Sequence, residues 1–339
     1  YECLVKDITR VKNRLKALYN SQAIKQRGRE LYHASKRQSW IEKLPNQGQR
    51  TRAELFFQQR WLLRVRCGKN NQGDVDVTTI GTVESLWRYP VKSMRGAEMP
   101  EAFMGFAGIY GDRCYAFKNS AARKGFPYLN ANVQQQMLLY RPQFRHPERA
   151  AKPPNLTEAV SIAPGVTPTN AEPNDLILDV VTPSGAIVAV DDPALIQMLG
   201  EGLRGENHLT LVRSDRALTD CRPVSLISLQ TIRQVEAELG IPIDKRRFRA
   251  NVYLNLASDY GFAEDKLVGR KLRIGSSAVI MVLERDPRCK MISLDPDTGE
   301  HNPEVLRKVA QAHDAFAGVY CAVLVEGMLT KGDSIEPLD

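Results

Sequence analysis

The sequence predicts an α+β protein that is mainly β, with a separate α-helical segment ahead of two β-rich domains. Helical periodicity dominates the first 68 residues, and many short β-type runs follow from residue 79. The charge also changes between these parts. Residues 1–68 hold 16 Lys or Arg against 5 Asp or Glu, whereas the rest of the chain holds 31 against 34. We therefore expect residues 1–68 to form a module of their own.

The N-terminal module begins with a basic amphipathic helix over residues 4–19. Further helical stretches at 39–44 and 52–66 predict a hairpin or coiled-coil arm of two or three helices. Two interpretations stay open: a solvated basic helix pair, or a surface that contacts the phosphate backbone of nucleic acid. The apolar residues that share one face of the first helix are Leu4, Ile8, Val11, Leu15 and Leu18.

Three runs in this module, at residues 4–19, 40–45 and 52–59, resemble the middle of DEDD-type bacterial insertion-sequence transposases. The catalytic acidic residues of that family lie largely upstream of the matching region. We therefore assign no nuclease site and expect residues 1–68 to be a transposase-like fragment fused beside another protein. Residues 69–78, rich in Gly, Asn and Asp, predict a linker.

The chain beyond the linker predicts β-barrel architecture, because short strands alternate with turn signals. We expect helices that begin at Asp192-Pro193, after Ser225 and at Asn302-Pro303, and an exposed loop with little regular structure over residues 141–173. The expected strands span residues 81–89, 113–118, 175–180, 186–190, 209–213, 251–256, 271–274, 278–283 and 319–325.

Cys289 is the most chemically suggestive residue of the sequence. It lies between Arg288 and Lys290, after the apolar run 278–283 and before an Asp-Pro-Asp-Thr-Gly turn at 295–299. Neighbouring cations favour a thiolate, which binds soft metals or attacks electrophiles. The alternative is a small apolar side chain at a strand end.

The six cysteines are scattered without a CxxC pair, and no secretory leader or apolar run of about 18 residues is present. We therefore expect a protein of the reducing cytoplasm with no membrane span.

Cys289 belongs to a set of short signals that occur in a fixed order, and together they resemble the MOSC family, named after the C-terminal domain of molybdenum cofactor sulfurase. The resemblance covers about residues 79–337. It implies a MOSC N-terminal β-barrel domain at 79–190 and a MOSC domain at 191–339, as in the mitochondrial amidoxime reducing component and its bacterial relatives. The signals are Tyr-Pro-Val-Lys-Ser at 89–93, Gly-Asp-Arg at 111–113, Phe-Arg-Ala-Asn-Val at 248–252, Phe-Ala-Glu-Asp at 262–265, Arg-Cys at 288–289 and the turn at 295–299.

The resemblance implies a molybdenum cofactor, a pterin dithiolene that carries molybdenum and a phosphate. Cations and forked donors suit the phosphate, and paired donor and acceptor groups suit the pterin edge. Cys289 matches the cysteine that ligates molybdenum and is the expected catalytic residue. The expected cofactor-binding residues are Lys92, Ser93, Arg113, Ser225, Arg249, Asn251 and Arg288.

Two features of this region leave questions open. Close relatives read Cys-x-Arg-Cys, whereas this chain has Asp286 at the first position, a departure that we expect to affect substrate handling or stability more than metal binding. The sequence also leaves open the roles of Asp220, Ser228, Glu264 and Asp265.

The expected function is a molybdenum-dependent oxidoreductase that reduces N-hydroxylated small molecules such as amidoximes and hydroxylamines. The sequence has no FAD or NAD fingerprint and no cysteine cluster for an iron–sulfur centre, so electrons would come from a separate ferredoxin- or cytochrome-like donor. One alternative is a non-catalytic carrier of the cofactor or of sulfur. Another is a nucleic-acid-binding protein that acts through residues 1–68.

Overall fold

The computed structural model describes residues 2–22, 24, 31, 36–46, 49–50, 53–54, 56–57 and 79–338. The chain divides into two compact units, Tyr1–Asp76 and Val77–Asp339. Within the described residues, no helix is both long and apolar enough to cross a membrane.

The first unit contains helices α1 (Glu2–Asn20) and α2 (Arg37–Glu42), which confirm the helices predicted at 4–19 and 39–44. Leu15 and Tyr19 of α1 are fully buried, and the Tyr19 ring packs edge-on against Trp40 of α2 with a centroid distance of 5.5 Å. A small apolar core therefore joins the two helices. Most of the stretch predicted to be helical at 52–66 lies outside the described residues, and the transposase-like origin of the segment stays a prediction.

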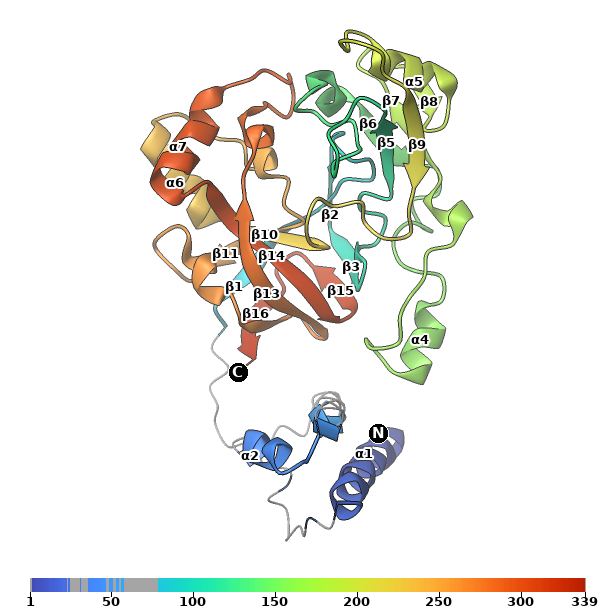
Figure 1. Cartoon of the computed structure of the whole chain (residues 1–339), viewed down its shortest axis with the longest axis vertical. Coiled ribbons are helices and arrows are strands. Elements are labelled where there is room, and N and C mark those ends of the chain that lie inside the picture. The colour runs from blue at the N-terminus through green and yellow to red at the C-terminus, as the bar shows by residue number, and fades with distance from the viewer. Residues whose placement is uncertain are drawn as a thin grey trace. The chain divides into compact units, whose positions relative to one another are not determined.

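The second unit is built around a closed barrel of seven strands (Figure 1). The strands are hydrogen-bonded in the order β11-β10-β14-β13-β12-β16-β1, and a β11–β1 pairing closes the ring. Their bounds are β1 Gly81–Arg88, β10 Val224–Ser228, β11 Val252–Leu256, β12 Lys271–Ile274, β13 Ala278–Pro287, β14 Phe316–Val325 and β16 Ser334–Leu338.

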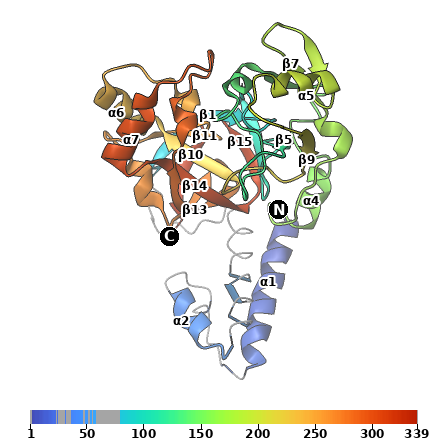
Figure 2. The same cartoon turned by 45° about the horizontal axis from the view of Figure 1, so that its top comes forward.

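Alternating side chains fill the barrel, and two helices cover one side of it. The strand pair β10–β11 is parallel, so its connection must cross over, and α6 (Leu229–Leu239) makes that crossover. Helix α7 (Pro303–His313) packs beside α6, and both views place the pair on the side away from β5 and β9 (Figures 1 and 2).

The rest of the second unit consists of three smaller sheets and two helices, α4 (Leu156–Ile162) and α5 (Pro193–Gly200). One sheet joins β15 (Gly327–Thr330), β3 (Glu101–Gly105) and β4 (Gly108–Ile109). The second pairs β5 (Tyr115–Asn119) with β9 (Leu209–Arg213). The third joins β6 (Arg141–Phe144), β7 (Leu178–Val181) and β8 (Ile187–Ala189), while β2 (Ala97–Met99) extends the barrel sheet beside β1.

Strands from before and after residue 190, where we predicted a domain boundary, share the same sheets. Strand β1, from the predicted first domain, completes the barrel formed by strands of the predicted second domain. Conversely, β9 from the predicted second domain pairs with β5 from the predicted first domain. The two domains are therefore interwoven. The boundaries at 68, 78 and 190 stay predictions.

Two local expectations need correction. Ser225 does not precede a helix, because it lies inside β10, and the N-cap of α6 is Ser228, whose side chain accepts a hydrogen bond from Thr231 N. Residues 141–173 are not an unstructured loop, since they contain β6 and α4. The N-caps predicted at Asp192 and Asn302 are confirmed.

Candidate cofactor site

Hydrogen bonds of the backbone and of the Asp112 side chain join the loop after β1 to residues 112–115. Asp112, which is buried, accepts a hydrogen bond from Tyr89 N at 2.7 Å through Oδ1. Arg113 N donates to Tyr89 O at 2.7 Å, and Lys92 N donates to Tyr115 O at 2.8 Å. The first two sequence signals therefore form one structural unit.

The ring of Tyr89 joins this unit to the loop before β11. The guanidinium of Arg249 lies 4.2 Å from the ring centroid and that of Arg113 lies 4.9 Å from it. Arg113 Nη2 also donates to Arg249 O at 3.1 Å. Three segments that are far apart in the sequence thus bring two guanidinium groups to one aromatic side chain.

Three of the expected cofactor residues have left-handed backbone conformations, with φ of 68° at Ser93, 45° at Arg113 and 52° at Arg249. Residues with a Cβ rarely adopt this conformation, which costs on the order of 1–2 kcal/mol each. Such strain persists only where the surrounding structure imposes it, and it concentrates at functional sites. Three of the seven expected cofactor residues therefore have a strained backbone, a conformation that Phe262, Asp314 and Ala315 share among the described residues.

The two arginines differ in electrostatic environment. Burial alone would lower the pKa of Arg113, but the adjacent Asp112 carboxylate outweighs that effect and raises it. Burial lowers the pKa of Arg249 to about 10, and its Nη2 is buried without a hydrogen-bond partner. Arg249 is therefore a half-buried cation with one buried, unpartnered donor nitrogen, which is the arrangement that an anionic ligand would complete.

Lys92 is already engaged within the protein. Its Nζ lies 2.6 Å from Asp220 Oδ1 and donates to Leu218 O at 2.9 Å. Burial lowers the pKa of Lys92, although the Asp220 carboxylate opposes that shift. This gives Asp220 a role that the sequence left open, namely the counter-ion of Lys92.

Ser225 and Asn251 bind one another inside the barrel wall. Asn251 Oδ1 accepts from Ser225 N at 3.3 Å, and its Nδ2 donates to Trp87 O at 3.4 Å. Both side chains are buried, and their hydrogen bonds link β10, β1 and the start of β11. Their contact with a cofactor stays a prediction.

Arg288 has a fixed, buried side chain. Its Nε donates to Ala317 O at 2.6 Å and its Nη1 donates to Phe248 O at 2.9 Å. Nη2 lies 2.9 Å from Asp286 Oδ2, which is ion-pair distance without the alignment of a hydrogen bond. Because Phe248 precedes Arg249, Arg288 connects the thiol loop to the guanidinium cluster.

Cys289 follows directly and has an exposed, free thiol. The described cysteines Cys114 and Cys321 are also free but buried, and burial raises the pKa of both thiols. Among the residues that the structure describes, no group of three or more His, Cys, Asp or Glu could hold a metal ion by itself. A metal at Cys289 would therefore take most of its ligands from a bound cofactor.

Ser228 and Glu264 form a buried structural network away from these groups. Glu264 accepts hydrogen bonds from Ser228 N at 3.1 Å, Ser228 Oγ at 2.8 Å and Thr231 Oγ1 at 2.7 Å. The network holds the N-terminus of α6. Burial and the neighbouring Glu264 carboxylate raise the pKa of Asp265 to about 6.

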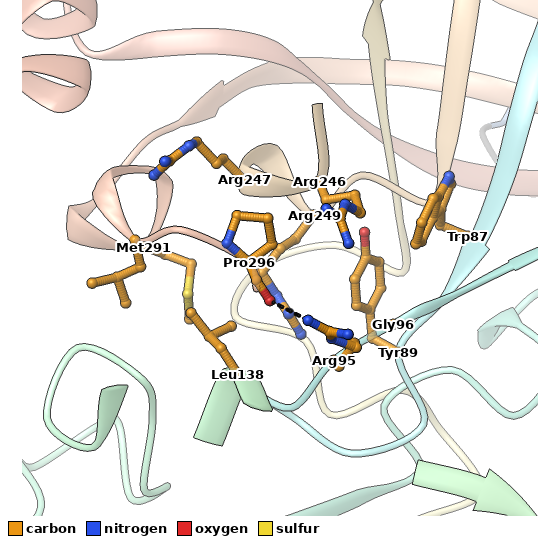
Figure 3. A pocket seen from close by; sticks show the side chains of 11 residues that line it. Trp87, Tyr89, Arg95, Gly96, Leu138, Arg246, Arg247, Arg249, Met291 and Pro296 are labelled. Carbon is orange, nitrogen blue, oxygen red and sulfur yellow. Dashed lines mark hydrogen bonds between the residues drawn. The ribbon is translucent and has the colours of Figure 1, made fainter. Parts of the chain in front are cut away.

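A pocket that Tyr89 and Arg249 help to line contains further residues that our sequence analysis missed (Figure 3). Arg95, Arg246 and Arg247 line it, and Arg95 donates to Pro296 O at 3.1 Å. Arg95 and Arg246 both bind Asp297, and Arg247 binds Asp295. Buried nitrogens without partners are Arg95 Nε, Arg247 Nε and Arg247 Nη1.

The signal for this pocket was present in the sequence as the basic run at 245–249. Arginines at 246, 247 and 249 within five residues would be costly to gather in a folded protein without anions nearby. Only Arg249 of this run matches a family signal, so the sequence pattern did not distinguish Arg246 and Arg247 from ordinary surface charge.

Comparisons with known proteins identify the two domains. Residues 213–336 match the model of the MOSC domain, and residues 80–156 match that of the MOSC N-terminal beta barrel domain. Comparison with curated proteins gives no match.

Similar solved structures include the YUAD protein from Bacillus subtilis, which is 14% identical, with 76% of this chain and 94% of that chain covered and a TM-score of 0.39. YiiM from Geobacillus stearothermophilus is 19% identical over 35% of this chain and 55% of that chain, with a TM-score of 0.29. By its two domain matches, the chain is a MOSC-domain protein in which a MOSC N-terminal β-barrel domain precedes the MOSC domain, a family associated with molybdenum cofactor binding.

Proposed function

We propose that this protein binds a molybdenum cofactor at the candidate site and reduces N-hydroxylated compounds, such as amidoximes and hydroxylamines, with electrons from a separate donor protein. The observation that carries the proposal is Arg249 Nη2, a buried guanidinium nitrogen that has no hydrogen-bond partner. Phe248, the residue before Arg249, accepts a hydrogen bond from Arg288, which directly precedes Cys289. A buried cation without an acceptor destabilises a protein unless a ligand compensates it.

The residues fit the chemical parts of the cofactor. Arg249 and Arg113 would bind the anionic phosphate end, since guanidinium groups donate forked hydrogen bonds to phosphate. Cys289 would supply one soft thiolate to the metal. Arg288, held by two backbone carbonyls, keeps the thiol loop in place.

When bound, the cofactor would supply the two-electron redox chemistry, which none of the amino-acid side chains provides. The protein's contribution is therefore to bind and orient. Cys289 is exposed, so a metal bound there would be accessible to a small substrate, while the half-buried Arg113 and Arg249 would hold the other end of the cofactor.

The test is to produce the full chain in cells that synthesise the cofactor, and to measure molybdenum, pterin and reduction of benzamidoxime by chemically reduced methyl viologen. We expect near-stoichiometric molybdenum and benzamidine as the product. A protein without molybdenum contradicts the proposal. Bound cofactor without turnover, despite the viologen donor, favours the non-catalytic carrier.

The separate electron donor is tested on the same preparation. Replacing viologen with a reduced plant-type ferredoxin or a reduced cytochrome b5 should restore benzamidoxime reduction with at least one of them. If both proteins fail while viologen succeeds, a donor of another class is required.

A further inference from the structure

Asn132 extends from the predicted N-terminal domain to the thiol of Cys289. Its Nδ2 donates to Cys289 Sγ at 3.8 Å, within the range of hydrogen bonds to sulfur. The two residues are 157 positions apart in the sequence. None of the sequence motifs includes Asn132, and only the folding of the chain brings this residue next to Cys289.

The turn that carries Asn132 is held in a defined conformation. Asn132 N donates to Asn130 Oδ1 at 3.0 Å, and Gln134 N donates to Asn130 O at 2.9 Å. Lys290 Nζ, from the residue after Cys289, donates to Asn132 O at 3.1 Å. Two contacts therefore fix the turn against the thiol loop, one through the Asn132 side chain and one through its backbone.

The orientation of the Asn132 amide costs stability. Its Oδ1 is buried and has no hydrogen-bond partner. A buried acceptor without a donor costs on the order of 1–3 kcal/mol. Rotating the amide would place its oxygen against the sulfur, and a thiolate would be repelled by that acceptor. The observed orientation therefore directs an N–H donor at a Cys289 thiolate, and it leaves the Asn132 Oδ1 atom without a donor.

We propose that Asn132 is a positioning residue for the predicted metal ligand: its N–H group donates to the Cys289 thiolate, fixes the direction of the sulfur and withdraws electron density from it. Hydrogen bonds to a ligating sulfur raise the reduction potential of the metal, because a thiolate that shares its charge with a donor stabilises the oxidised metal less. This inference rests on the proposed function, which places molybdenum at Cys289.

The experiment compares Asn132→Leu and Asn132→Asp in the full chain. Both keep the size of the side chain and remove the N–H donor, and Asp adds a negative charge. Asn130→Asp is the matched control, because it lies in the same turn, keeps the oxygen that accepts from Asn132 N, and does not contact the thiol. The measurements are molybdenum content, the midpoint potential and the EPR signal of molybdenum, and the melting temperature of cofactor-free protein.

We expect both Asn132 variants to shift the EPR signal and to lower the midpoint potential, Asp more than Leu, or to lose molybdenum, while the control matches the parent. Cofactor-free Asn132→Leu should melt at the parent temperature or above it, because it removes an unsatisfied buried oxygen. An unchanged potential and EPR signal in both variants overturn this inference alone. A parent protein without molybdenum overturns the proposed function and this inference with it.

Discussion

Asp286 Oδ2 lies 2.9 Å from Arg288 Nη2, and both side chains are buried, with 2% and 7% of their side-chain surface exposed. Asp286 is the residue at which this sequence departs from the Cys-x-Arg-Cys pattern of the family that it resembles. It is the counter-ion of Arg288, whose other nitrogens bind carbonyls of Phe248 and Ala317. Asp286 therefore supports the thiol loop through Arg288.

Replacing Asp286 with Asn should destabilise the protein strongly, because Arg288 would keep a buried charge without its counter-ion. We expect a loss of about 3 kcal/mol in the free energy of unfolding, measured by urea titration of cofactor-free protein. Breaking the exposed pair Glu304–Arg307 by Arg307→Gln is the control and should change it by roughly 0–1 kcal/mol. Equal losses of unfolding free energy in the two variants would show that the buried Asp286–Arg288 pair contributes no more to stability than an exposed pair.

Removing the charge of Arg249 should separate cofactor binding from stability. Arg249→Gln should lower cofactor affinity about tenfold or more, since a charge-assisted contact is worth roughly 1.5–3 kcal/mol. The cofactor-free variant should be as stable as the parent or more stable, because burial disfavours the Arg249 charge and its Nη2 has no hydrogen-bond partner.

The matched comparison for Arg249→Gln is Asp112→Asn, which leaves Arg113 without its carboxylate and should destabilise the cofactor-free protein. The measurements are pterin retained after gel filtration and the melting temperature. Full retention of pterin by Arg249→Gln would remove Arg249 from the site.

Asp265 should make stability fall as pH rises from about 4 to 6. Its pKa is raised to about 6 in the folded protein, above the value of about 3.9 for an unfolded Asp. The folded state therefore holds a proton that the unfolded state has released, and folding loses stability as pH rises through that interval. Asp265→Asn should be more stable than the parent at pH 7 and equal to it below about pH 4. A difference in unfolding free energy that does not vary with pH would contradict this.

The N-terminal unit should be dispensable for cofactor binding. A chain that begins at Val77 contains the whole second compact unit and all expected site residues. We expect it to fold and to hold as much molybdenum per protein as the full chain. Insoluble or metal-free protein, beside a loaded full chain, would show that residues 1–76 belong to the functional unit.

Sequence patterns located the long strands and the capped helices because these depend on local signals. Leu209–Arg213 and Lys271–Ile274 were predicted at their observed bounds, and Asp192 and Asn302 cap helices as expected. Strand β3 was not predicted, because it is short and its longer pairing is with β15, more than 200 residues away in the chain.

In the site, too, residues in local motifs could be predicted, whereas contacts between distant segments could not. Motif order pointed to Arg113, Arg249 and Cys289, and the structure connects them through Tyr89 and Arg288. Asn132 could not be found from its neighbours in the sequence, since its contact with Cys289 exists only after the two domains pack. The placement of Ser225 was wrong because the strand before the helix was read as part of the helix.

The central claim is that the Cys289 thiolate ligates molybdenum, and Cys289→Ser tests it most directly. A hydroxyl is a hard and normally protonated ligand, so the variant should keep its fold and part of its pterin while losing most benzamidoxime reduction with reduced viologen. Cys221→Ser is the matched control, since Cys221 is also an exposed free thiol. Molybdenum content and reduction rate are measured side by side for both variants and the parent. Near-complete loss of rate in Cys289→Ser alone is the predicted result, and a parental rate in that variant would contradict the account.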